Sequence, residues 1–109
     1  MAVSCLIMFA ARASAFDTVI LDPGHGGHDC GAAIGYVYEK HLALDTARRV
    51  AQLLGSAGLR VVMTRERDVF IPLDGRSAMG NSRPGAVFVS IHYNYNRSGS
   101  GHGIDTYHC

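Results

Sequence analysis

The sequence predicts an α/β fold with a largely parallel or mixed sheet and helices on both faces. Apolar runs rich in β-branched residues recur along the 109-residue chain. Segments with helical apolar spacing separate these runs, and glycine or proline stands at the boundaries. The resulting order of strand, helix, strand, helix, strand requires right-handed crossovers, which make the strands parallel and place helices on either side of them.

The first half of the chain is expected to hold one strand, one loop and one long helix. Residues 18–21 form a short apolar run that is typical of a buried strand. The loop from Gly24 to Gly35 contains five glycines in twelve residues, so its backbone can adopt positive φ angles and pass close to a bound group. Residues 39–54 have the apolar spacing of a helix, and Gly55 follows as a stop signal.

The second half repeats this alternation and adds one strand. Residues 59–64 predict a second strand, and residues 72–81 predict a helix with Pro72 in its first turn, where proline is tolerated. The most apolar strand is predicted at residues 86–91. A loop rich in serine, glycine and asparagine covers residues 94–101, and residues 103–107 predict a fourth strand.

The N-terminus differs in composition from the rest of the chain. Met1 to Ala15 is mostly apolar and ends in Ala13-Ser14-Ala15, the small-residue pattern of a signal peptidase site. We therefore expect residues 1–15 to be a signal peptide, the alternative being a buried or frayed N-terminal segment, and residues 16–109 to form a single domain. The apolar stretch is too short to span a bilayer, so no stable membrane span is expected.

Charge gives no indication of nucleic-acid binding. Without Arg12, which lies in the expected signal peptide, nine basic and nine acidic residues remain. The nearest approaches to a basic cluster are Arg48 with Arg49 and Arg65 with Arg67, which are typical of solvated surfaces. We expect no nucleic-acid partner.

The cysteines leave one question open. Cys30 follows the glycine-rich loop motif and Cys109 is the last residue. An oxidising compartment would permit a disulfide between them, but two cysteines without known geometry are weak grounds for a bridge.

Three residues form a candidate metal site. His25 and His92 each follow the carboxyl end of a predicted strand, and Glu39 begins the helix after the first loop. Ligand sites in parallel sheets lie beyond the carboxyl ends of the strands, so the topology brings these residues to one edge. Two imidazoles and one carboxylate form a set that zinc enzymes use when a fourth position stays open for water.

Each of these residues also has an ordinary structural explanation. His25 could cap backbone groups of its loop, His92 could be a partly buried histidine, and Glu39 could be a carboxylate favoured by the helix macrodipole. Their occurrence together favours a metal. A phosphate-binding loop is a further alternative, but the chain has neither the Gly-x-Gly-x-x-Gly spacing nor a Lys-Ser/Thr ending.

The motifs resemble those of a known family. Asp22-Pro23-Gly24-His25-Gly26-Gly27 is similar to the opening of the zinc-dependent N-acetylmuramoyl-L-alanine amidases, the type 3 amidases of bacterial cell walls. Glu39 resembles the second ligand of that family, and Ser90-Ile91-His92-Tyr93-Asn94 resembles its third-ligand strand. The similarity extends from Thr18 to Tyr107, with Asp105 at a position where the family often has glutamate.

The resemblance implies zinc bound by His25, Glu39 and His92, and hydrolysis of the amide between N-acetylmuramic acid and L-alanine of peptidoglycan. Asp22 and Asp29 would orient His25 or its loop, and Asn94 is the candidate substrate-binding residue. Peptidoglycan is then the expected partner. An exported protein, periplasmic or extracellular at the cell wall, fits that substrate.

The chain departs from the family at the general base. The resemblance implies a glutamate near the C-terminus of longer members, whereas this sequence contains only Glu39 and Glu66. We expect the base to lie beyond Cys109 and the chain to be a truncated amidase domain, with Glu66 as a weak substitute. Loss of a general base costs about 10²- to 10⁴-fold in rate. The alternative is therefore a catalytically impaired, zinc-containing module that binds peptidoglycan or has a regulatory role.

Overall fold

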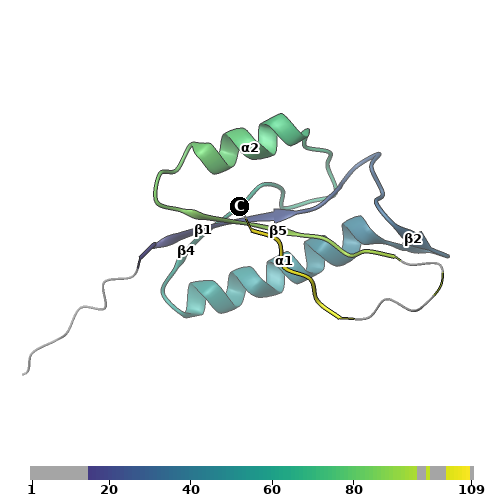
Figure 1. Cartoon of the computed structure of the whole chain (residues 1–109), viewed down its shortest axis with the longest axis horizontal. Coiled ribbons are helices and arrows are strands. Elements are labelled where there is room, and N and C mark those ends of the chain that lie inside the picture. The colour runs from purple at the N-terminus through teal and green to yellow at the C-terminus, as the bar shows by residue number, and fades with distance from the viewer. Residues whose placement is uncertain (1–14, 96–97, 99–102, 109) are drawn as a thin grey trace, which may run out of the picture.

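The structure is a computed structural model that describes residues 15–95, 98 and 103–108. It contains one main sheet, a small hairpin and two helices (Figure 1). In chain order the elements are β1 (Thr18–Pro23), β2 (Ala33–Ile34), β3 (Val37–Tyr38), α1 (Glu39–Ser56), β4 (Arg60–Met63), α2 (Leu73–Asn81) and β5 (Val87–Ile91). The predicted signal peptide falls almost wholly outside the described residues.

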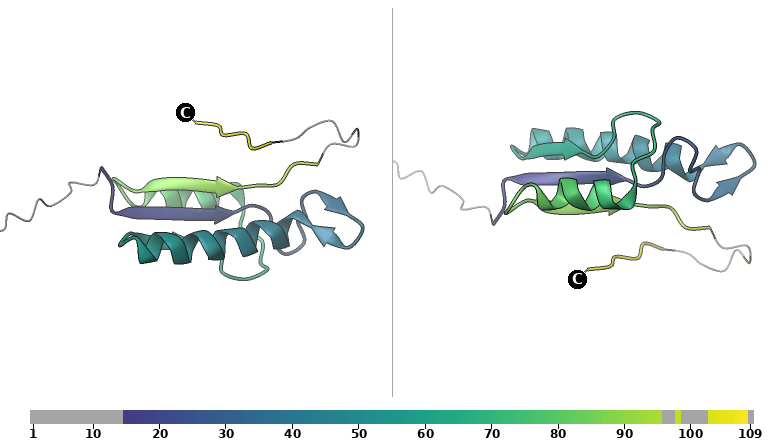
Figure 2. Two further views of the ribbon diagram at one scale, coloured as in Figure 1. Left: turned by 90° about the horizontal axis from the view of Figure 1, so that it is seen from below. Right: turned by 90° about the horizontal axis from the view of Figure 1, so that it is seen from above.

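The main sheet is parallel and has the strand order β4-β1-β5. Helix α1 packs against one face and α2 against the other, as Figures 1 and 2 show. The two helical connections return each strand to the same direction, so the carboxyl ends of all three strands meet at one edge. The predicted α/β fold class is confirmed.

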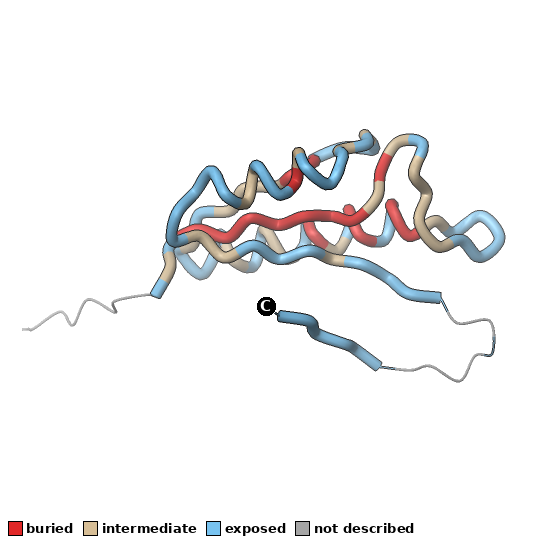
Figure 3. Tube along the Cα trace, turned by 45° about the horizontal axis from the view of Figure 1, so that its top comes forward, coloured by how far each residue is buried: buried red, intermediate tan, exposed pale blue. Residues whose placement is uncertain are grey.

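Strand β1 forms the centre of the hydrophobic core. Every one of its residues is buried (Figure 3). Ile20 and Leu21 are each 1% exposed. A central strand covered by helices on both faces loses contact with water on both sides, which explains its continuous apolar sequence. Helix α1 contributes Ala43, Leu44 and Ala47 to the same core.

The glycine-rich loop contains a hairpin that the sequence analysis did not predict. Strands β2 and β3 pair antiparallel around Gly35 and Tyr36. Gly35 has a φ of 58°, in the left-handed region that tight hairpin turns require. The two-residue strands are too short to show an alternating pattern in the sequence, so only the turn glycine could have indicated them.

The prediction of a fourth strand at residues 103–107 is wrong. Residues 103–108 adopt no strand, and Ile104 and Tyr107 are 96% and 86% exposed. A strand forms when its backbone groups pair with a neighbour. Within the described part of the chain no backbone pairs with this segment, so its apolar and β-branched composition is not sufficient.

Helix α1 begins directly at the hairpin. The backbone N–H of Glu39 donates to Ala32 O at 2.8 Å, and that of Lys40 donates to Cys30 O at 3.3 Å. These bonds satisfy two of the free N–H groups at the helix start and fix the first turn against the loop. Neither of the two described helices combines the length and the apolar character that a membrane crossing needs.

Candidate metal centre

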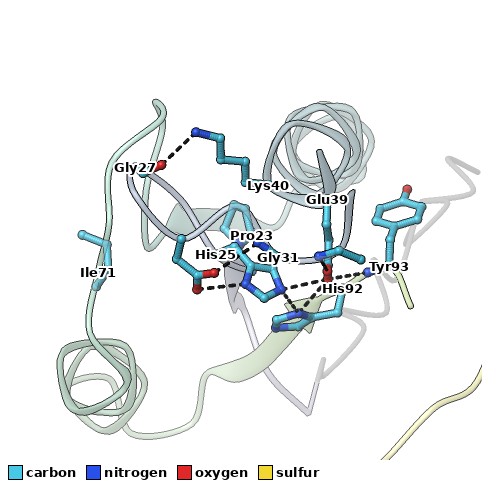
Figure 4. A network of polar contacts seen from close by, with 12 residues as sticks. Pro23, His25, Gly27, Gly31, Glu39, Lys40, Ile71, His92 and Tyr93 are labelled. Atoms are coloured by element: carbon cyan, nitrogen blue, oxygen red, sulfur yellow. Dashed lines mark hydrogen bonds and ion pairs between the residues drawn. The ribbon is translucent and has the colours of Figure 1, made fainter. Parts of the chain in front are cut away.

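Three elements bring the candidate metal ligands to one edge of the sheet. Pro23 at the end of β1 lies opposite Ile91 at the end of β5, and the next residue, Gly24, donates its N–H to Ile91 O at 2.9 Å. His25 and His92 therefore leave neighbouring strands side by side. Glu39 approaches them from the first turn of α1, and the three side chains converge in Figure 4.

The donor atoms lie close enough together to share one small cation. His25 Nε2 and His92 Nδ1 are each 3.0 Å from Glu39 Oε1, and the two nitrogens are 3.2 Å apart. Tetrahedral zinc with bonds of about 2.0–2.2 Å separates its ligand atoms by about 3.3–3.6 Å. The observed separations of 3.0–3.2 Å are slightly shorter than this, so the residues fit zinc in their chemistry and would need only a small outward movement to reach its spacing.

Backbone donors keep the Glu39 carboxylate charged. Glu39 is 6% exposed, and its two oxygens accept the N–H of Ala32 and the N–H of Tyr93, each at 2.8 Å. Burial raises the pKa of Glu39, but these two hydrogen bonds and the contact with His92 outweigh burial, so its pKa is lowered overall. Glu39 is thus an anion held by donors, as a metal ligand must be.

Asp29 determines which nitrogen of His25 faces the centre. Its Oδ2 lies 2.9 Å from His25 Nδ1, so a proton on Nδ1 would be held by Asp29 and Nε2 would be left to bind a metal. The hydrogen bond from His25 lowers the pKa of Asp29, and the N–H of Gly31 adds to the effect. The structure thus places Asp29 where the sequence analysis expected it, beside His25.

Two glycines leave room for the imidazoles. A Cβ on Gly31 would lie 2.5 Å from His25 Cδ2 and 2.6 Å from Glu39 Oε2, and one on Gly24 would lie 2.3 Å from His92 Cε1. Gly31 also has a φ of 64°, which favours glycine. Any other residue at position 31 would collide with two of the three candidate ligands.

Asp22 was expected to orient either His25 or its loop, and its contacts bear on the second alternative. It is buried; its Oδ1 accepts Thr64 Oγ1 and Arg76 Nη1, each at 2.6 Å, and its Oδ2 accepts Ser90 Oγ at 2.7 Å. These contacts tie the end of β1 to β5, to α2 and to the residue after β4. Asp22 thus acts on the backbone around the site.

A buried arginine that the sequence analysis treated as a solvated residue also holds this region. Arg65 is 3% exposed and donates to Pro23 O, Gly24 O and Lys40 O at 2.8–2.9 Å. Burial lowers the pKa of its guanidinium, and the nearby charge of Arg76 lowers it further. Its position after a strand, next to the polar turn, gave no signal of burial in the sequence.

Two hollows flank the candidate ligands. One, of about 450 Å³, runs past His25 and His92 toward the start of α2. The other, of about 130 Å³, lies on the far side of Glu39, and the exposed Asn94 is one of its lining residues. The first hollow is lined by Asp22, His25, Asp29, Phe70, Ile71, Leu73, Arg76, Ser90 and His92.

Two other residues that the sequence analysis weighed lie apart from this group. Glu66 is exposed in the turn after β4 and lines neither hollow. Cys30 is a free, partly exposed cysteine, and Cys109, its possible partner, lies outside the described residues.

A parallel sheet with a histidine, glutamate and histidine group at its carboxyl edge defines an α/β protein with a candidate metal centre. The family model of N-acetylmuramoyl-L-alanine amidases matches residues 19–108, and the chain belongs to that family.

Relatives and solved structures agree with this assignment. The amidase AmiC of Neisseria meningitidis is 48% identical over 90 residues, which are 82% of this chain and 22% of AmiC. The amidase LytC of Bacillus subtilis is 39% identical over 84% of this chain and 18% of LytC. The crystal structure of an amidase from Clostridium difficile 630 superposes with a TM-score of 0.71 at 37% identity, covering 82% of this chain and 50% of that one. The chain thus spans about a fifth of the length of the first two relatives.

Proposed function

We propose that this protein is a zinc-dependent enzyme that hydrolyses the amide between N-acetylmuramic acid and L-alanine in peptidoglycan, with zinc held by His25, Glu39 and His92. The observation that carries the proposal is the convergence of their three donor atoms within 3.2 Å of one another, in a chain of the amidase family. An exported protein acting at the cell wall fits this substrate, and one relative is named a probable cell wall amidase.

The residues of this chain would divide the work as follows. Zinc, when bound, supplies Lewis-acid chemistry that makes water nucleophilic near neutral pH. Asp29 would hold a proton on His25 Nδ1 and leave Nε2 to bind the metal, while the backbone donors of Ala32 and Tyr93 keep Glu39 ionised. The larger hollow beside the two histidines offers space for the substrate, and Asn94 would contact it from the other side.

Metal analysis and wall digestion test the two halves of this proposal. Purified protein should contain about one zinc per chain, and H25A and H92A should lose it. H41A is the matched control, because His41 is exposed on α1 and does not belong to the ligand group. Incubation of the wild type with purified peptidoglycan should release stem peptides. A protein that binds no zinc would contradict the metal centre.

One observation favours a second function, a zinc-containing module that binds peptidoglycan without cleaving it. The carboxylates that line the larger hollow are Asp22 and Asp29, and both are already engaged, Asp22 by Arg76 and Asp29 by His25. A general base needs a carboxylate free to accept a proton from water. Among the described residues that line this hollow, no such group is present. Zinc binding and co-sedimentation with peptidoglycan, without release of stem peptides, would identify this second function.

A further inference from the structure

Arg76 on α2 holds the backbone on both sides of Gly24. Its Nη1 donates to Asp22 Oδ1 at 2.6 Å and to Pro23 O at 2.8 Å, and its Nη2 donates to His25 O at 2.7 Å. The Nε of the same guanidinium donates to Ile71 O at 2.8 Å. Arg76 is 5% exposed. All three of its nitrogens are therefore engaged, and two of its four acceptors are carbonyls of the segment that ends at His25.

His25 needs such support because of its backbone. Its φ is 61°, and it is the only residue other than glycine with positive φ in the described part of the chain. This left-handed conformation costs an L-residue about 1–2 kcal/mol and persists when the surroundings over-determine it. It also directs the imidazole toward Glu39 and His92 (Figure 4). Relaxation to negative φ would move Nε2 away from the other two donors.

Asp22 fixes the position of the guanidinium. Its Oδ1 accepts both Arg76 Nη1 and the hydroxyl of Thr64, and its Oδ2 accepts the hydroxyl of Ser90. Thr64 follows β4 and Ser90 lies in β5, so the pair is anchored to both outer strands of the main sheet. Buried ion pairs of this kind contribute little net stability, because desolvation offsets their attraction. We therefore expect the Asp22–Arg76 pair to affect the backbone geometry at His25 more than the stability of the fold.

We propose that Arg76, anchored by Asp22, is a positioning residue that keeps His25 in its left-handed conformation and thereby sets the metal affinity of the centre. This inference rests on the zinc centre of the proposed function. Arg76 contacts none of the three donor atoms. It acts through the carbonyl of His25, while Asp29 acts through the ring of the same residue.

The test compares zinc affinity in R76K and T64V, measured by competition with a chromophoric chelator. Lysine keeps a positive charge beside Asp22 but lacks the planar fork that reaches several acceptors at once. The dissociation constant of R76K should rise at least about tenfold, the scale typical of residues that orient metal ligands. T64V removes one contact of Asp22 and none of Arg76; it should bind zinc within about twofold of the wild type.

Unfolding of the metal-free proteins separates positioning from stability. If R76K and T64V lose similar stability in urea with a chelator present, but only R76K loses zinc affinity, the positioning role is supported. If R76K does not fold, the zinc affinity of D22N tests the inference instead, because this variant weakens the ion pair that anchors Arg76 and leaves the arginine itself in place. D22N should then bind zinc more weakly than T64V.

Equal zinc affinity in the wild type and in whichever of R76K or D22N folds would overturn the inference while leaving the proposed function intact. If the wild type binds no zinc, both the proposed function and the positioning role of Arg76 are overturned. This outcome needs no variant, since it is measured on the wild type alone.

Discussion

Single residues decide whether the three donor atoms can meet. Gly31 and His25 both have φ angles near 60°, and each occupies a position that the other constrains, since a Cβ on Gly31 would strike the His25 ring. The left-handed conformation of His25 therefore depends on glycine at position 31, where a side chain would occupy the space of the His25 ring.

Replacement of Gly31 by alanine should weaken zinc binding specifically. We expect G31A to raise the zinc dissociation constant by about 10- to 100-fold, because its methyl group would displace His25 and Glu39. G35A is the matched control: Gly35 has a φ of 58°, and a methyl group added there would meet no atom within 4 Å. Both variants bear the same backbone strain of about 1–2 kcal/mol. Equal zinc affinities in G31A and G35A would show that crowding at position 31 is unimportant.

Asp68 makes the loop sensitive to acid. Its Oδ2 lies 2.7 Å from Lys40 Nζ, and its Oδ1 accepts the N–H of Gly27 at 2.7 Å. The hydrogen bond from Lys40, with that from Gly27, lowers the pKa of Asp68 from 3.8 to about 2. Because the folded-state pKa is lower, the carboxylate stabilises the fold above pH 3.8, and this contribution disappears as the pH falls through about 2.

The D68N variant isolates that contribution. Its urea midpoint should lie below that of the wild type at about pH 6, and the difference should shrink as the pH falls toward about 2. The effect is modest because the Asp68 side chain is 40% exposed. D45N serves as a control, since Asp45 pairs with Arg49 on the exposed face of α1. If the urea midpoints of the wild type and D68N differed by the same amount at every pH, the lowered pKa of Asp68 would not be the cause.

At the scale of elements, β1 determines the stability of the sheet. It pairs with both other strands of the main sheet, and both helices pack against it. I20V should lower the free energy of unfolding by about 0.5–1.5 kcal/mol, because Ile20 is 1% exposed and a lost methylene leaves a cavity. Urea titration measures this, with L53A as the control, since Leu53 is 71% exposed and should change stability by less than about 0.5 kcal/mol. A larger loss in L53A would mean that α1 is packed differently.

The elements can be predicted from the sequence where their signals are local. The β1 run and the periodicity of α1 follow directly from burial, so both predictions agree with the structure to within two residues at each end. The segment 103–107 has a strand-like composition, but composition does not supply a pairing partner. The hairpin β2–β3 escapes prediction because its strands are two residues long.

The candidate site was predictable only in part. Motifs and topology indicated His25, Glu39 and His92, and the structure brings them together. The burial of Arg65 and Arg76 could not be predicted, because an arginine after a strand or within a short helix is usually solvated. Only the fold places both guanidinium groups against the carbonyl of Pro23 at the end of β1.

At the scale of the whole molecule, the centre joins parts of the chain that are far apart in sequence. His25 and His92 are 67 residues apart, and Glu39 stands on a third element. A metal bound there would link the loop after β1, the start of α1 and the end of β5. Such a site forms only when the sheet is folded, so metal binding and folding are coupled.

Zinc should therefore stabilise the folded chain. At a free zinc concentration of about 100 times the dissociation constant, the free energy of unfolding should increase by about 2.7 kcal/mol, provided that the unfolded chain binds no metal. Urea titrations at increasing zinc should show this rise in the wild type, and a chelator should reverse it. H92A should show no rise, because it removes one of the three donors, whereas H41A should behave as the wild type. An unfolding midpoint independent of zinc, in a chain that binds zinc, would mean that the ligands bind metal equally well when unfolded and that the sheet does not assemble the centre.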